Sequence, residues 1–81
     1  MRIIAEIPHP DCKIFVFYMN QKYIVKFEKG NFEQSYKISE LDSVIAGIED
    51  IKKVINETLI TSVLLRFQQM QSDMQLALKD Y

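Results

Sequence analysis

The segment Pro8-His9-Pro10-Asp11-Cys12 is the one place in the chain where reactive side chains lie close together. A metal site here would have at most His, Asp and Cys from one loop, and no second Cys or His exists to complete a zinc shell. A Cys12–His9 catalytic pair would also need an orienting group and an oxyanion hole. Two prolines favour a stiff connection between strands, with Asp11 starting a turn. We therefore expect no catalytic, metal-binding or cofactor-binding residues here, and a thiol of ordinary reactivity.

The remaining short motifs also favour structural roles. Gly30 and Gly47 are too few and too far apart for a glycine-rich phosphate loop. Glu49-Asp50 offers oxygen ligands for a cation, but acidic residues also stabilise the first turn of a helix through its dipole, which is the commoner arrangement. The sequence therefore predicts a protein without enzymatic chemistry.

The chain has 81 residues and predicts a single domain over residues 1–81. A domain of this size buries roughly 60% of the surface that its unfolded chain exposes, so its stability is marginal without disulfides, metals or self-association. One cysteine excludes an internal disulfide and favours a reducing compartment. Self-association is the remaining source of stability, and we expect a homodimer.

Charge and hydropathy narrow the classes further. The net charge is −1, far from the basic excess of dedicated nucleic-acid binders. The longest apolar run, Ile14 to Met19, is far shorter than a membrane span, and Glu6 interrupts the apolar N-terminus too early for a signal peptide. These features predict a cytoplasmic protein with no membrane partner.

Residues 2–38 alternate between apolar and polar side chains, which is typical of strands. Asn20-Gln21 lies between two β-rich runs and suits a two-residue turn, and Gly30-Asn31 suits the next. The first turn sets a register in which three pairs face each other: Tyr18 with Tyr23, Val16 with Val25, and Ile14 with Phe27.

That register divides the sheet into two faces, because side chains alternate along a strand. Face one is an apolar layer that needs a helix over it. Its expected members are Ile3, Ala5, Ile7, Ile14, Val16, Tyr18, Tyr23, Val25, Phe27, Phe32, Tyr36 and Ile38. Face two has an apolar centre made by Phe15, Phe17, Met19 and Ile24. It also carries Lys13, Lys22, Lys26 and Lys37, with Glu28, Glu33 and Ser35. An apolar patch with a charged rim is typical of a contact surface.

Residues 41–81 follow a helical period. Ser39-Glu-Leu-Asp42 carries cap-forming residues, and a helix is expected to begin, or begin again, near Ile48, which leaves open whether there is one helix or two. Apolar residues recur at spacings of three and four, and they are Ile60, Val63, Phe67, Met70, Met74, Ala77 and Tyr81. A helix from Leu59 to Tyr81 is about 34 Å long, whereas strands of six or seven residues reach about 20 Å. Its end is therefore expected to extend past the sheet and expose Met70, Met74, Leu78 and Tyr81.

The run from Lys13 to Gly30, followed by Phe32-Glu33-Gln34, resembles a family of short bacterial proteins of Bacteroidetes type. The likeness continues through Asp50-Ile51 and Leu65-Arg66-Phe67, and it implies no activity because the matching residues form no catalytic motif. In topology alone, four antiparallel strands followed by a helix are similar to PC4-like and Whirly-like domains, in which a dimer holds single strands on its sheet.

We predict an α+β fold: a four-stranded antiparallel meander over residues 2–38, followed by helical segments over residues 41–81 packed on one face. The predicted function is a non-enzymatic, homo-oligomeric interaction module. Its candidate interface residues are Phe15, Phe17, Met19, Ile24, Met70, Met74, Leu78 and Tyr81. The alternative is single-stranded nucleic-acid binding on face two through Lys13, Phe15, Phe17, Lys22, Lys26 and Lys37.

Overall fold

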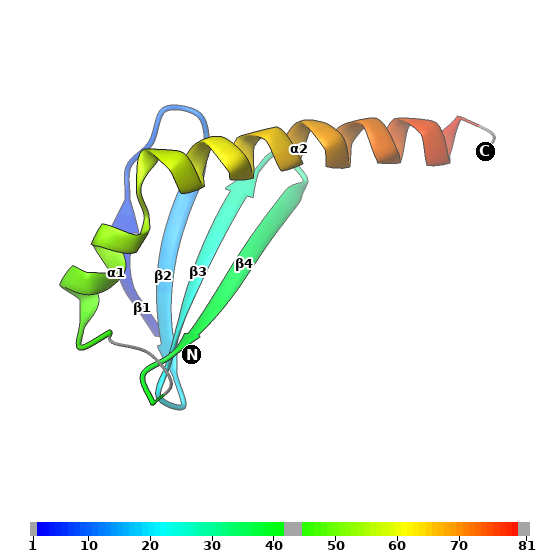
Figure 1. Ribbon diagram of the computed structural model, residues 1–81. Helices are drawn as coiled ribbons and strands as arrows, with labels where there is room; N and C mark the ends of the chain where they lie inside the picture. The colour runs from blue at the N-terminus through cyan, green and yellow to red at the C-terminus, as the bar shows by residue number, and fades with distance from the viewer. Residues whose placement is uncertain (1, 42–44, 80–81) are drawn as a thin grey trace.

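The computed structural model describes residues 2–41 and 45–79. It contains a four-stranded antiparallel sheet in the order β1-β2-β3-β4, followed by two helices (Figure 1). The strands are β1 (Arg2–Ile7), β2 (Lys13–Met19), β3 (Lys22–Lys29) and β4 (Phe32–Ser39), and the helices are α1 (Ile48–Val54) and α2 (Glu57–Leu78). The predicted α+β meander with C-terminal helices is confirmed.

The two hairpin turns explain why β2, β3 and β4 pair in the predicted register. Asn20 and Gln21 both have positive φ, 52° and 61°, as in the type I′ turn that matches the twist of paired strands. In the second turn only Gly30 has positive φ, at 60°, which is the pattern of a type II′ turn. The predicted pairs across β2 and β3, including Val16 with Val25, are all present.

The first strand departs from the prediction. Ala5 and Ile7 face the core, but the register of β1 against β2 shifts between Ile3 and Ala5, so that Ile3 pairs with Phe17. A bulge inserts one residue and reverses the alternation beyond it. Ile3 therefore lies on face two, where it is 58% exposed, and its predicted place on face one is wrong.

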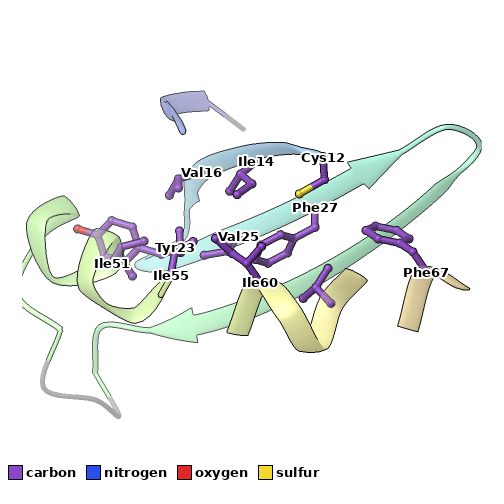
Figure 2. Close-up of a cluster of buried hydrophobic side chains, with 11 residues drawn as sticks. Cys12, Ile14, Val16, Tyr23, Val25, Phe27, Ile51, Ile55, Ile60 and Phe67 are labelled. Atoms are coloured by element: carbon purple, nitrogen blue, oxygen red, sulfur yellow. The ribbon is translucent and has the colours of Figure 1, made fainter. Parts of the chain in front are cut away.

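The helices pack on face one and close the core, which Figure 2 shows between sheet and helices. Its sheet residues include Ile14, Val16, Val25 and Phe27. The two helices supply Ile51, Ile60, Val63 and Phe67, and the connection between them supplies Ile55. Within face one, Tyr36 differs most from the predicted burial. It was expected in the buried layer, but it lies on the edge strand β4 and is 36% exposed.

The described helical part is two helices, and α1 begins at Ile48, where a helix was expected to begin or begin again. Ser39 ends β4, and its hydroxyl accepts a hydrogen bond from the Leu41 amide at 3.2 Å, so it closes a turn, and the N-caps of the two described helices are Gly47 and Asn56. Asp42, the other predicted cap, lies outside the described residues. The break between α1 and α2 falls at Asn56, whose Oδ1 accepts from the Leu59 amide at 2.9 Å and so caps α2.

Helix α2 crosses the sheet and then leaves it (Figure 1). The Gln34 side-chain amide donates to the Val63 carbonyl at 2.9 Å, and Arg66 Nη1 donates to the Tyr36 hydroxyl at 2.7 Å, so the helix passes over β4. Residues 68–78, which we name the projecting segment, continue for about 16 Å past these contacts. This segment accounts for the elongated shape, 47 × 24 × 20 Å.

Neither helix in the described residues combines the length and the apolar character that crossing a bilayer requires.

Candidate interaction surfaces

The loop between β1 and β2 holds His9, Asp11 and Cys12, the reactive side chains that lie close together in the sequence. His9 Nδ1 accepts a hydrogen bond from the Asp11 amide at 3.1 Å, so the imidazole supports the turn that Asp11 was predicted to start. Cys12 is buried at the edge of the core, and the peptide bonds before Pro8 and Pro10 are trans. Among the described residues, no three His, Cys, Asp or Glu side chains lie close enough to hold a metal.

The electrostatics at Cys12 oppose a reactive thiolate. Burial raises the pKa of the Cys12 thiol, Asp11 raises it further, and Lys29 opposes both with a smaller effect. A nucleophilic cysteine needs the opposite shift, since the thiolate is the reacting form. The upward shift in the pKa of Cys12 agrees with the expectation that this pKa is not lowered.

Face two carries an apolar patch, which we define as Ile3, Phe15, Phe17, Met19 and Ile24. Phe17 lies between Ile3 on β1 and Ile24 on β3, so these three side chains form an apolar row across the sheet. The rings of Phe15 and Phe17 have their centroids 6.4 Å apart at an interplanar angle of 40°. Both helices pack on the other face, so nothing in the described chain covers the patch.

The structure enlarges the patch that the sequence predicted. Ile3 joins it only because of the bulge in β1, and no pattern in Arg2-Ile3-Ile4-Ala5 marks where the bulge falls. Two consecutive isoleucines leave the alternation ambiguous at that point, so the sequence signal was missing.

The charges of face two are partly neutralised within the sheet. Lys26 Nζ lies 2.9 Å from Glu33 Oε2 and 3.7 Å from Glu28 Oε2. The Lys26 ammonium donates a hydrogen bond to the Glu33 carboxylate, which raises the pKa of Lys26 and keeps it charged. Lys13 lies at the other end of the sheet from Lys22. Lys22, Lys37 and Lys26 occupy three successive face-two positions across β3 and β4, and of these Lys26 is engaged by the two glutamates.

The projecting segment carries the second exposed apolar surface. The stripe that buries Ile60, Val63 and Phe67 continues through half-buried Met70 to Met74 and Leu78, which are 45% and 56% exposed. The predicted exposure of Met74 and Leu78 is confirmed, and Met70 is more buried than expected because it packs against the edge of the core. Tyr81, the last predicted member, lies outside the described residues.

A hollow of about 320 Å³ lies where the helix leaves the sheet. One wall is the β3–β4 turn from Lys29 to Phe32, and the other is formed by Phe67, Gln68 and Gln71 of α2. The apolar stripe of the projecting segment thus begins beside this hollow, at the β3–β4 corner of the sheet.

The two apolar surfaces are separate. The patch lies on face two, whereas the projecting stripe continues the helix layer on face one, so the predicted interface residues do not form one surface. No protein family, curated protein or solved structure matches this chain.

Proposed function

We propose that this protein is a non-enzymatic interaction module that works as a homo-oligomer. The observation that carries the proposal is the end of the projecting segment, about two helical turns after Gln71 whose apolar residues Met74 and Leu78 have no sheet beneath them. A helix that packs on nothing gains little from its amphipathic pattern, because most helical stability in proteins comes from burying the apolar face. A second copy of the chain would supply the missing contact, and no other protein would be needed.

The apolar patch on face two supports a role in holding a protein partner. Aromatic and methionine side chains are enriched in protein interfaces, and Phe15, Phe17 and Met19 are of these types. Each lies half-buried or exposed beside charged residues, which is the arrangement of an interface centre with a polar rim.

Single-stranded nucleic acid is the alternative occupant of face two, and the charges disfavour it. Such binders combine stacking aromatics with a positive groove along the backbone. Lys26, the lysine opposite Phe15, is already held by Glu33 and Glu28. The aromatic rings are present, but the neighbouring lysines that remain to meet a backbone are only Lys22 and Lys37.

Sedimentation velocity over a range of micromolar concentrations tests the proposal. We expect the wild type to form a dimer or larger oligomer, and Met74→Lys to shift it toward monomer by placing a charge in the stripe. Leu76→Lys is the matched control, since it makes the same chemical change in the same segment about 200° around the helix from Met74. Thermal unfolding followed by circular dichroism confirms that both variants fold. A wild type that stays monomeric at the highest concentration contradicts the proposal.

A further inference from the structure

The outer edge of β4 is open, whereas that of β1 is protected. Strand edges present unpaired backbone groups, and proteins usually blunt them with bulges, prolines or short strands. β1 has six residues, contains the bulge after Ile3 and is followed by Pro8. β4 has eight residues in regular register with β3, with no proline, glycine or bulge. Within the described residues no strand pairs with its outer side.

The phase of the β3–β4 ladder determines which backbone groups point outward. The two-residue turn makes Lys29 and Phe32 a hydrogen-bonded pair, and such pairs recur at every second residue. The bond from the Glu40 amide to the Gln21 carbonyl, 3.0 Å, has the same phase. The amides and carbonyls of Glu33, Ser35 and Lys37 therefore point away from β3, where a further strand would bind them.

The sequence of this edge is complementary to itself. In an antiparallel pair of two β4 strands centred on Ser35, the residues whose numbers sum to 70 lie opposite each other. Glu33 of each copy then faces Lys37 of the other on face two, and Phe32 faces Ile38 on face one. Opposite charges and apolar residues at directly opposed positions stabilise antiparallel pairs. The pairing also joins outward-pointing residues to outward-pointing residues, as the hydrogen bonds require.

The projecting segment lies over the same edge. The last contacts of α2 with its own sheet are with β4 and with the turn before it, and the helix then extends past that side of the sheet (Figure 1). Strands are spaced about 4.8 Å apart, so the residues from 72 to the helix end at Leu78, which cover about 10 Å, span about two further strand positions. An added strand would find an apolar cover above its inward face.

Because the partner strand runs in the opposite direction, the partner's helix would cover the part of β4 that the chain's own helix leaves exposed. α2 crosses β4 near Phe32 and Gln34 and leaves Tyr36 36% exposed. In the antiparallel pair, the end of one β4 that carries Phe32 lies beside the end of the other that carries Ile38. The projecting segment of each copy therefore comes over the Tyr36 end of its partner.

From these observations we infer that a second copy of this chain adds to β4, so that two sheets join edge to edge and each α2 extends over the partner's sheet. The inference rests on the proposed homo-oligomer and specifies its geometry. The two-fold axis stands perpendicular to the sheet at Ser35. Both helix layers lie on one side, and both Phe15–Phe17 patches lie on the other, open to a partner.

Ser35→Pro tests the edge pairing. Proline removes an outward-pointing amide, so it leaves the β3–β4 hydrogen bonds intact while blocking the added strand. We expect Ser35→Pro to be monomeric where the wild type is dimeric, and Ser35→Ala, which keeps the amide, to match the wild type. Circular dichroism melting of the three proteins verifies the fold.

A charge exchange gives an independent test if Ser35→Pro does not fold. Lys37→Glu places like charges opposite each other twice across the axis and leaves the Lys26–Glu33 bridge unchanged. We expect the dimer dissociation constant to rise about tenfold. Adding Glu33→Lys restores opposite charges at both sites and should return the constant toward the wild-type value. Because it also removes the Lys26–Glu33 bridge, Glu33→Lys alone is the control, and it should raise the constant as Lys37→Glu does.

The outcomes separate this geometry from the proposed function. Loss of the dimer in Ser35→Pro supports the β4 pairing, as does recovery of the weakened Lys37→Glu dimer when Glu33→Lys is added. A dimer that persists in a folded Ser35→Pro overturns the geometry and leaves self-association standing, and its dissociation in Phe17→Lys then places the contact on face two. A wild type that never associates overturns both.

Discussion

Val25 and Tyr36 face each other on one rung of the β3–β4 ladder but differ in burial, at 1% and 36% exposed. We expect Val25→Asp to lower the free energy of unfolding by several kcal/mol, enough to unfold a domain this small, because a buried carboxylate has no partner there. Tyr36→Asp loses an edge-to-face contact with Phe27 and the hydroxyl contact with Arg66, and we expect a loss of about 1–2 kcal/mol. Urea denaturation compares them, and equal losses would contradict the assigned burial.

Cys12 gives a prediction for alkaline pH. Burial raises the pKa of its thiol above the ordinary value of 9.0, so the folded protein holds the thiol proton more tightly than the unfolded chain. The stability linked to this proton is therefore present below about pH 9 and is lost as the pH rises through the folded-state pKa. Cys12→Val lacks the titration. We expect the free energy of unfolding to fall more steeply above about pH 9 in the wild type than in this variant, and parallel slopes would contradict it.

At the scale of secondary-structure elements, Asn56 separates two helices that no glycine or proline divides. Its side chain satisfies the Leu59 amide, one of the donors that a helix start leaves unpaired. Asn56→Ala should lower the free energy of unfolding by about 1 kcal/mol, whereas Asn56→Asp keeps the acceptor and should cost little. Chemical denaturation measures both. If the alanine and aspartate variants are equally stable, the cap contributes nothing.

The elements differ in how far the sequence determined them. The hairpins were predictable because turn chemistry and alternation agree over β2 and β3, and a slip by one residue would expose Val16 and Val25. The bulge in β1 was not, because Ile3 and Ile4 are equally apolar. The exposed stripe of α2 followed from helix length alone. The open edge of β4 depends on which strand ends the sheet, and that is a property of the whole topology.

At the scale of the whole molecule, the chain has one buried core and three incomplete surfaces: the patch on face two, the projecting stripe and the edge of β4. The core is small, and it closes only where α1 and the first half of α2 cover face one. Edge pairing would complete two of the three surfaces in one contact. It would leave the patch, with Phe15 and Phe17 at its centre, as the surface through which the assembly meets something else.

The molecule that binds this patch distinguishes a protein interaction module from a single-strand nucleic-acid binder. Glu33 and Glu28 hold Lys26, and Lys13 lies at the far end of the sheet. Lys22 and Lys37 are then the two neighbouring lysines left to meet phosphates, so few phosphates could be neutralised together. Affinity for single strands rises with the number of phosphates neutralised and weakens with salt accordingly. We therefore expect no change in fluorescence anisotropy when a labelled single-stranded DNA or RNA is mixed with the protein at low salt. Binding that weakens as salt rises, with a slope reduced by Lys22→Ala together with Lys26→Ala, would instead establish face two as a nucleic-acid surface.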